Sequence, residues 1–579
     1  MRTSRDELVA RYRARRHWSD LRITDLFDAA VRAAPDRLAV IDPPNRTELT
    51  DGPALRLSFA ELSALVDACA WHLHQLGFVR DDILVTQLPN IAEYIAVYLA
   101  AARLGVIVTP VPMQFRGHEL EQIVALTAAR NVLTVATFKG ARHDFSCAGQ
   151  DGGSPRVLTL GNIAAPGATP FAPAALDAPA RAALRDHIES LAISADDIVT
   201  ICWTSGTEAA PKGVPRSHNH WIAISHAHFT GAGIRPGDRL LNPFPLVNMA
   251  AIGGCFMSWL HAAGTLVLHH PFDLQVYLRQ VTAERVQYAI APPAILNMLI
   301  KDPRLLADAD LSSLRCIGSG SAPLDPAMIR EFRERFGIEI MNMFGSNEGM
   351  ALVNNAEYAP EPERRARYFP RFGRPEIEWA NPPPIVIETR LVDPDSGEEI
   401  LAADTPGEMQ IRGPTVFDGY YGAPGLTSHA FTPDGYFRTG DLFDIPGDAD
   451  RMRYYRFVGR LKQLIVRGGV KISPEELDDV LAQIPQVLEG AVTGYRDEIM
   501  GERICAVVVA RPGADLTLEA VRQHFAASGL ASFKRPERLC IVAQLPRNST
   551  GKVVRAELAR IAAQVAAGAD PAPVQTSTA

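Results

Sequence analysis

The sequence has 579 residues, which is too long for one hydrophobic core, since single cores stop growing at about 250–300 residues. Its 47% hydrophobic and 21% charged residues are typical of a soluble globular protein. The formal net charge of −8 argues against a general nucleic-acid-binding protein, which needs a basic surface. The Arg-rich residues 1–18 lack the apolar stretch of a secretory signal, so they favour a cytoplasmic protein.

Helix-like and strand-like patterns alternate in the first third of the chain. Residues 57–76 predict a helix, because apolar residues recur at helical spacing, Ser58 can cap its start and Glu61 follows three residues later. A strand, a helix and a second strand are then expected at 82–87, 93–104 and 106–112. This alternation predicts a mostly parallel sheet that is covered by helices.

The middle of the chain continues this pattern and then changes to strands. Residues 160–183 are rich in Ala and Pro, and we expect a surface connection there. A short apolar strand is predicted at 198–203, and two further strand–helix units at 265–277 and 286–299. Turn signals between 385 and 445 separate short strands and predict a β-rich portion.

The predicted fold is therefore a multidomain α/β protein. We expect a large N-terminal domain at 1–460, with parallel-type sheets, helices and the β-rich portion. A small α+β domain with a βααβ order is expected at 461–564, and residues 565–579 predict a disordered tail of Ala, Pro, Thr and Ser. No apolar run approaches the roughly 18 residues of a membrane-spanning helix. The seven cysteines form no CxxC pair, which favours buried thiols in a reducing compartment over a zinc or redox site.

The strongest chemical signal is the run TSGTEAAPKG at 204–213, directly after an apolar strand. Small and hydroxylic residues let backbone N–H groups approach an anion, and Lys212 adds a positive charge. The ATPase pattern GxxxxGK[ST] is absent, and a Gly/Ser/Thr surface turn is a common alternative for such a string. The run alone therefore indicates an anion-binding loop without naming the anion.

This run resembles the phosphate loop of the adenylate-forming superfamily, which joins acyl-CoA synthetases, peptide-synthetase adenylation domains and beetle luciferase. The family usually has TSGTTGxPKG, and here Glu208 and Ala209 replace a hydroxylic residue and a glycine. The resemblance implies phosphate contacts for the loop residues Thr204, Ser205, Gly206, Thr207 and Lys212.

Two later segments resemble the adenine-binding motifs of the same family. GSGSAP at 318–323 resembles the segment that lines the adenine pocket, and NMFGSNE at 342–348 resembles the motif YGxTE. The resemblance implies that Phe344 stacks on adenine and that Glu348 helps to hold Mg²⁺. Asn347 replaces the family threonine that contacts the α-phosphate, and its amide can still donate a hydrogen bond. The other implied nucleotide contacts are Gly320, Ser321, Ala322, Asn342, Met343, Gly345 and Ser346.

The remaining motifs follow in the order that the family has. In YFRTGDL at 436–442, the resemblance implies that Asp441 binds the ribose hydroxyls. In GRLK at 459–462, it implies that Arg460 binds nucleotide and that Lys462 is the hinge. PRNSTGK matches the family's tail motif, so Lys552 is implied to reach the junction of the carboxylate and the α-phosphate. Because all the motifs occur in order, the chain is identified as a member of this superfamily.

The resemblance implies that ATP and a carboxylic acid form an acyl-AMP and pyrophosphate, and that a thiol then takes the acyl group. The loop would hold the β- and γ-phosphates, and Mg²⁺ near Glu348 would spread their charge. Lys552, with Asn347 and Glu348, would stabilise the transition state. The small C-terminal domain is mobile in the family, and here it would rotate about Lys462 between the two half-reactions.

The acid pocket is expected between the helix after the phosphate loop and residues 318–344. Most of its candidates are apolar, with no basic residue for a second carboxylate and no Asp at 243–248 for an amino group. A monocarboxylic acid is therefore favoured over an amino acid. The details of SGTEAAPKG and FGSNEG resemble ligases for cyclic, aromatic or medium-chain acids. The candidate pocket residues are His220, Trp221, Phe244, Asn248, Met249, Ile252 and Gly253.

Three hypotheses about the activity remain. The thiol acceptor is either CoA or the phosphopantetheine of an acyl carrier protein, and the absence of a carrier domain favours CoA. The N-terminal run HWSDLRITDLF resembles aryl-acid AMP ligases, which use a carrier protein. A catalytically degenerate relative is favoured by Glu208, Ala209 and Asn347 but opposed by the retained Lys552. Homodimers are common in the family, although the sequence itself carries no signal for one.

Overall fold

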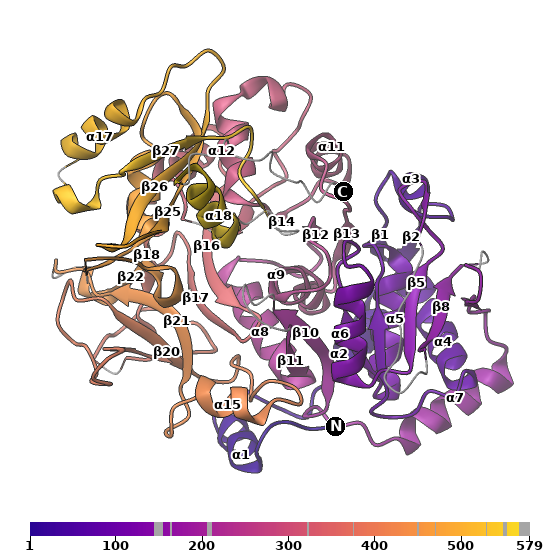
Figure 1. Cartoon of the computed structure of the whole chain (residues 1–579). Coiled ribbons are helices and arrows are strands. Elements are labelled where there is room, and N and C mark those ends of the chain that lie inside the picture. The colour runs from indigo at the N-terminus through magenta and orange to yellow at the C-terminus, as the bar shows by residue number, and fades with distance from the viewer. Residues whose placement is uncertain are drawn as a thin grey trace. The chain divides into compact units, whose positions relative to one another are not determined.

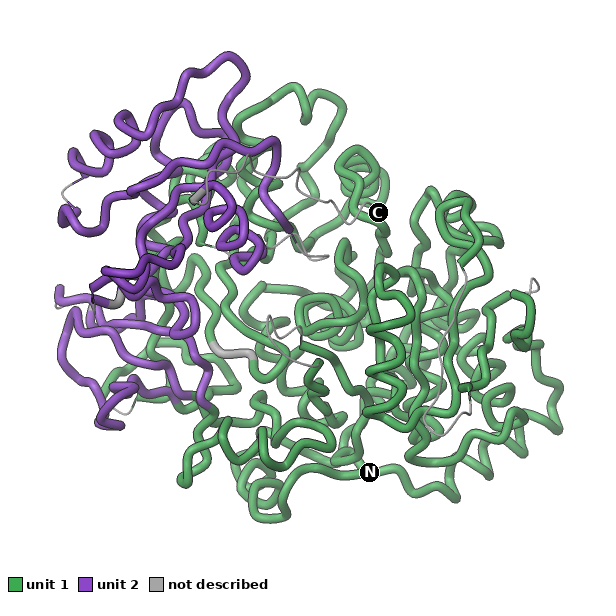
Figure 2. The backbone as a smooth tube through the Cα atoms, in the orientation of Figure 1, with its two compact units in different colours: residues 1–388, 411–437 green, residues 389–410, 438–579 purple. Residues whose placement is uncertain are grey.

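The computed structural model describes residues 1–143, 154–161, 165–204, 211–320, 323–374, 376–448, 451–468, 470–528, 530–547 and 553–566. The chain forms two compact units (Figure 2). The first unit comprises Met1–Glu388 and Ile411–Phe437, and the second comprises Thr389–Gln410 and Arg438–Ala579. No helix in the described part combines the length and the apolar character that crossing a membrane requires.

The first unit contains two large sheets that are parallel except at their edges (Figure 1). In the eight-stranded sheet, β2 and β17 are the antiparallel edge strands, and the strands between them are parallel. Its order is β17 (Gly349–Asn354), β16 (Glu339–Ser346), β15 (Cys316–Gly320), β14 (Tyr288–Ile290), β12 (Arg239–Asn242), β13 (Thr265–Leu268), β1 (Leu38–Ile41) and β2 (Arg56–Ser58).

The seven-stranded sheet has one antiparallel pair, formed by β10 and β11. Its order is β11 (Lys212–Ser217), β10 (Ile198–Thr204), β4 (Ile107–Pro110), β3 (Ile83–Thr86), β5 (Asn131–Val135), β8 (Arg156–Leu160) and β9 (Thr169–Phe171). The helices between the strands of both sheets include α4 (Phe59–Gln75), α5 (Ala92–Leu104), α6 (Gly117–Thr127), α7 (Ala178–Ser190), α11 (Leu274–Glu284), α12 (Pro293–Lys301) and α13 (Pro326–Phe336).

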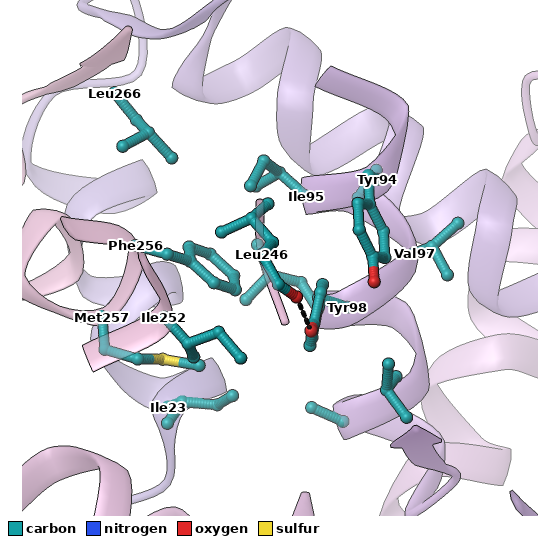
Figure 3. Packing of buried hydrophobic residues seen from close by; sticks show 14 of the residues in the cluster. Ile23, Tyr94, Ile95, Val97, Tyr98, Leu246, Ile252, Phe256, Met257 and Leu266 are labelled. Carbon is teal, nitrogen blue, oxygen red and sulfur yellow. Dashed lines mark hydrogen bonds between the residues drawn. The ribbon is translucent and has the colours of Figure 1, made fainter. Parts of the chain in front are cut away.

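The main core of this unit lies between the two sheets. One continuous cluster contains Leu84 of the seven-stranded sheet, Leu240 of the eight-stranded sheet and nearly all of α5. Figure 3 shows Tyr98 of α5 directed toward Leu246, beside Ile252 and Phe256, and its hydroxyl donates to the Leu246 carbonyl at 2.8 Å. Leaving this buried hydroxyl without a hydrogen-bond partner would cost about 1–3 kcal/mol. The other helices around this core are α2 (Ile23–Ala33), α8 (His218–Gly231), α10 (Ser258–Ala262) and the π-helix η2 (Ile252–Met257).

The second unit is built mostly from antiparallel strands. In one sheet, β22 (Tyr454–Arg460), β21 (Phe437–Asp444), β20 (Gly407–Arg412) and β19 (Glu388–Val392) are neighbours in that order. In another sheet the order is β24 (Val470–Ile472), β23 (Ile465–Arg467), β26 (Gly501–Ala510) and β25 (Val487–Asp497), and β27 (Arg538–Ile541) lies parallel to β26. Its helices are α16 (Pro474–Leu481), α17 (Leu518–Ala527) and α18 (Arg555–Ala566).

The predicted fold class is confirmed: the chain is α/β, with mixed sheets, a β-rich portion and a smaller C-terminal region of strands and helices. The helix predicted at 57–76 is α4, and Ser58 and Glu61 form its capping box. Two predictions of local structure are wrong. Residues 160–183 are more than a connection, because they contain β9 and the start of α7. The βααβ order is wrong because β25 and β26 form a long hairpin between α16 and α17.

The limits of the two compact units differ from the predicted boundary at residue 460. Strands β21 and β22 precede that boundary, yet they belong almost entirely to the second unit. Compactness does not decide which residues move, so the domains 1–460 and 461–564 stay predictions. Helix α18 ends at Ala566, and the remaining residues of the predicted tail lie outside the described part.

Candidate nucleotide-binding site

The predicted phosphate loop connects the two antiparallel strands β10 and β11. Backbone pairing places Thr204 opposite Lys212, so the ladder fixes both ends of the loop. A Cβ atom at Gly213 would lie 2.9 Å from Ile201 and 3.2 Å from Tyr421, so only glycine fits there without displacement. The predicted ligands Ser205, Gly206 and Thr207 lie outside the described residues, as do Glu208 and Ala209.

Glu348 and Lys212 contact the same tyrosine. Glu348 lies in the two-residue turn between β16 and β17, where Ser346 pairs with Gly349. The Tyr420 hydroxyl donates to Oε1 of Glu348 at 3.2 Å, and the Lys212 ammonium lies 5.2 Å from the centroid of the Tyr420 ring. Tyr420 was not among the residues predicted from the sequence. It brings the predicted Mg²⁺ carboxylate and the predicted phosphate lysine together.

Burial and the neighbouring Glu348 carboxylate raise the pKa of the Tyr420 phenol. The phenol therefore stays protonated at physiological pH and acts as the hydrogen-bond donor. Because the ring face is electron-rich, it also attracts the Lys212 ammonium, an interaction of about 0.5–1 kcal/mol at an exposed site.

Asn347 joins two segments that border this cluster. Its Nδ2 donates to the Trp203 carbonyl at 3.0 Å, at the end of β10, and its Oδ1 accepts from the Met249 backbone N–H at 2.9 Å. Met249 begins the short helix α9 (Met249–Ala251), which Asn248 caps by accepting from the Ala251 N–H at 3.1 Å. The Asn347 amide carries a second N–H hydrogen, so the predicted contact with the α-phosphate is compatible with these bonds.

The predicted adenine segment lies at the carboxyl ends of β15 and β16. Gly320 pairs with Met343, and a Cβ atom at Gly320 would lie only 2.2 Å from the Met343 carbonyl oxygen. Phe344 is half-buried, 6.0 Å from the ring of Phe369, and Gly345 is exposed. Ser346 Oγ accepts from the Glu348 N–H at 3.2 Å, while Ser321 and Ala322 lie outside the described residues.

Asn342 has a structural role that its motif does not predict. It is buried, and its Nδ2 donates to the carbonyls of Arg365 and Ala366 at 2.9 and 3.0 Å. Both acceptors belong to α14 (Pro362–Arg367). The Asn342 side chain therefore anchors that helix to β16, and its nucleotide contact stays a prediction.

His220 is buried in the interior of the first unit, and its predicted place in the acid pocket stays a prediction. It is fully buried at the start of α8, where its Nδ1 contacts the Ser217 hydroxyl at 2.9 Å and its Nε2 lies 3.1 Å from the Val416 carbonyl. Burial, and then the nearby Arg216 charge, hold the pKa of His220 well below its usual value. Both ring nitrogens therefore have protein partners, which describes a neutral, structural histidine.

The other predicted acid-pocket residues divide into buried and half-buried sets. Trp221 is buried, with its Nε1 donating to Thr200 Oγ1 at 2.9 Å, and Ile252 and Gly253 are buried as well. Phe244, Asn248 and Met249 are half-buried. In the part of the chain that the structure describes, a cavity of about 30 Å³ and a surface pocket of about 620 Å³ contain none of these residues. Their role in acid binding stays a prediction.

In the second unit, the structure brings two predicted nucleotide ligands together. Asp441 and Arg460 are directly opposite each other in β21 and β22, and Arg460 Nε lies 2.9 Å from Asp441 Oδ1. Gly440 has φ +71°, a conformation that favours glycine, and its N–H donates to Glu408 at 3.1 Å. Lys462 is exposed in the 3₁₀ turn Leu461–Gln463, directly after β22, and Lys552 lies outside the described residues.

The chemistry of these residues fits a metal–nucleotide ligand. Within the described ranges, no group of three or more His, Cys, Asp or Glu side chains is arranged to hold a metal ion. Mg²⁺ commonly uses one or two carboxylates together with substrate phosphates rather than an all-protein cage. The single carboxylate of Glu348, beside the cation of Lys212 and the loop at 204–213, matches that mode of binding.

Comparison with known proteins is independent of this geometry. The model of the AMP-binding enzyme family matches residues 27–421, and the model of the AMP-binding enzyme C-terminal domain matches residues 476–552. The chain is 29% identical to 2-hydroxy-7-methoxy-5-methyl-1-naphthoate–CoA ligase of Streptomyces carzinostaticus, over 95% of this chain and 94% of that protein.

Two further proteins extend the comparison. Pyochelin synthase PchD of Pseudomonas aeruginosa is 30% identical over 95% of this chain and 94% of its own length. The crystal structure of ATP-bound MatB from Rhodopseudomonas palustris superposes with a TM-score of 0.72 at 25% identity, covering 93% of this chain and 99% of that one.

Proposed function

Because the chain belongs to the family of AMP-binding enzymes, we propose that it is an AMP-forming acid–CoA ligase. It converts a monocarboxylic acid and ATP into an acyl-AMP and pyrophosphate, and then transfers the acyl group to CoA. The observation that carries the proposal is the joining of Glu348 and Lys212 by Tyr420, beside the anchored loop. This arrangement offers a carboxylate ligand for Mg²⁺ and a cation for the phosphates within one unit.

The residues of the first unit serve the first half-reaction by binding and orienting the nucleotide. Bound Mg²⁺ would be held by Glu348 and would neutralise charge on the phosphates. Lys212 compensates phosphate charge at the base of the loop, and Tyr420 limits the freedom of both side chains. No side-chain nucleophile is needed, because the carboxylate oxygen attacks the α-phosphorus and pyrophosphate leaves.

The residues of the second unit supply the ribose contact and the final positive charge. Asp441 accepts from the ribose hydroxyls, and Arg460, which already pairs with it, holds that carboxylate in place. Lys552 stabilises the charge that develops between the acid and the α-phosphate. We also propose that the domains 1–460 and 461–564 rotate about Lys462 between the half-reactions, which the exposure of this lysine supports.

The proposed acid is a monocarboxylic acid with an apolar, cyclic or aromatic body. The similarity to a naphthoate–CoA ligase and the apolar character of the predicted pocket residues support this class. The chain is also similar to pyochelin synthase PchD, and the phosphopantetheine of a carrier protein is therefore the alternative acceptor. The free cysteines of the described part, including the neighbouring thiols of Cys505 and Cys540, support a cytoplasmic location.

Acid-dependent exchange of pyrophosphate into ATP tests the proposal. A panel of benzoic, naphthoic, cyclohexanecarboxylic and medium-chain fatty acids is assayed with Mg²⁺ and without CoA. Exchange with one class of acid is expected, followed by thioester formation when CoA is added. Thioester formation with a holo-carrier protein but not with CoA would select the alternative acceptor. No exchange with any acid, despite ATP binding, would select the degenerate relative.

A further inference from the structure

Arg216 is a buried cation on the same strand as the phosphate lysine. It lies in β11, which begins at Lys212, and its side chain is 1% exposed. Its guanidinium donates to backbone carbonyls of two separate segments. One N–H donates to Thr415 at 2.8 Å, while Nε and the other terminal nitrogen donate to Asn347 at 3.2 and 2.5 Å.

The two segments that Arg216 contacts are also joined to each other. The Phe417 N–H donates to the Glu348 carbonyl at 2.8 Å, and Gly349 forms an antiparallel bridge with Val416. One segment carries the Glu348 carboxylate, and the other carries the Tyr420 phenol that binds it. Arg216 therefore fixes the backbone on both sides of the bond between Glu348 and Tyr420.

The charge of Arg216 is retained despite its burial. Burial lowers the pKa of Arg216 from 12.5 to about 10, so the guanidinium stays protonated at neutral pH. The carboxylates of Asp418 and Glu348 favour its charged form, and Asp418 accepts a hydrogen bond from the Ser4 hydroxyl at 2.5 Å. Hydrogen bonds from a charged donor are stronger than those from a neutral one, so Arg216 holds the two carbonyls firmly in place.

We propose that Arg216 is a positioning residue for Mg²⁺–nucleotide binding, acting through the Asn347–Glu348 turn and the segment that carries Tyr420. Without it, the turn and this segment lose their common anchor, and Glu348 no longer faces Lys212 in one fixed arrangement. The inference rests on the proposed function, because it takes Glu348 as the Mg²⁺ ligand. Arg216 acts through the two backbone carbonyls that its guanidinium binds.

Calorimetric titration of the full-length protein with ATP, at several Mg²⁺ concentrations and in EDTA, tests the role without any acid. Arg216→Met removes the donors and keeps an unbranched side chain. We expect the Kd for ATP in Mg²⁺ to rise about tenfold, as is typical when the support of a metal ligand is removed. The Kd in EDTA should change less than about twofold, because the loop contacts remain.

Arg46→Met is the matched control. Arg46 is also almost fully buried in the first unit. It donates to Glu93 and to the Asp51 carbonyl, and neither belongs to the two segments that Arg216 binds. Both variants should lose thermal stability, but only Arg216→Met should change the Mg²⁺ dependence. If Arg216→Met does not fold, Arg216→Lys decides, because it keeps the charge but cannot bridge both carbonyls in the same way.

The possible outcomes separate this inference from the proposed function. Equal Mg²⁺ dependence in the folded Arg216 variant and in Arg46→Met would overturn the positioning role and leave Arg216 as a purely structural residue. Failure of the wild-type protein to bind ATP with Mg²⁺ would instead overturn the proposed function. A raised Mg²⁺ requirement in the Arg216 variant alone supports the inference.

Discussion

Replacing Tyr420 with Phe removes one hydroxyl and leaves the ring above which Lys212 lies. The lost bond joins the phenol to a carboxylate oxygen at 3.2 Å. Hydrogen bonds to charged groups contribute about 1.5–3 kcal/mol when they are buried. Because Tyr420 is half-buried, solvent screening reduces this, and we expect a loss of about 1 kcal/mol.

A loss of that size corresponds to a roughly fivefold lower kcat/KM for ATP. The assay is acid-dependent pyrophosphate exchange at limiting Mg²⁺, with an acid that the panel selects. Tyr420→Leu should lower kcat/KM for ATP further, because it also removes the ring and about 0.5–1 kcal/mol of attraction to Lys212. The phenol of Tyr420 has a raised pKa, so the ratio of wild type to Tyr420→Phe should not change between pH 6 and pH 9.

Tyr421→Phe is the matched control for this pair of variants. Tyr421 is adjacent and half-buried, and within the described part its hydroxyl forms no hydrogen bond. Its backbone N–H donates to the Gly213 carbonyl at 2.8 Å, a bond that the substitution preserves. If Tyr420→Phe were as active as Tyr421→Phe at limiting Mg²⁺, the reasoning about Tyr420 would be refuted.

Three further predictions concern the two half-reactions and the stability of the site. Lys552→Ala should abolish acyl-AMP formation and spare thioester formation from supplied acyl-AMP; an equal fall in both would contradict the two-conformation mechanism. Lys462→Pro should spare pyrophosphate exchange and slow thioester formation, and unchanged overall turnover would contradict the hinge assignment. Burial raises the pKa of Asp418 to about 6 from 3.8, so the folded state binds the extra proton between these values. Stability should therefore fall by up to about 3 kcal/mol as pH rises from about 4 to 6 and stay flat above. Asp418→Asn should remove this slope in urea unfolding curves, and an unchanged slope would exclude Asp418 as its source.

Much of the fold was predictable because local signals and packing agree. Ser58 and Glu61 are three residues apart, and the capping box that this spacing predicts begins α4. The hairpin of β25 and β26 was missed because its turn has no Asn-Gly or Asp-Gly pair. Instead, Asp497 accepts from the N–H groups of Ile499 and Met500, and Gly501 takes φ +75°.

The site was predictable only where chemistry is encoded in a short motif. Lys212, Glu348 and Asp441 stand in such motifs. Tyr420 does not, because it meets Glu348 across 72 residues of sequence, through pairing between two distant segments. His220 was predicted for the acid pocket, and that role stays a prediction. The spacing Ser217-x-x-His220 at a helix start also fits a capping box, which its contacts show.

The central claim is that the acid is activated through an acyl-AMP, and an isotope experiment tests it most directly. An accepted acid is labelled with ¹⁸O in its carboxylate and incubated with ATP, Mg²⁺ and CoA in unlabelled water. The attacking carboxylate oxygen stays on phosphorus when the thiol displaces AMP, so AMP should carry one ¹⁸O atom by mass spectrometry. Unlabelled AMP, or label found in inorganic phosphate with ADP as the product, would contradict the account.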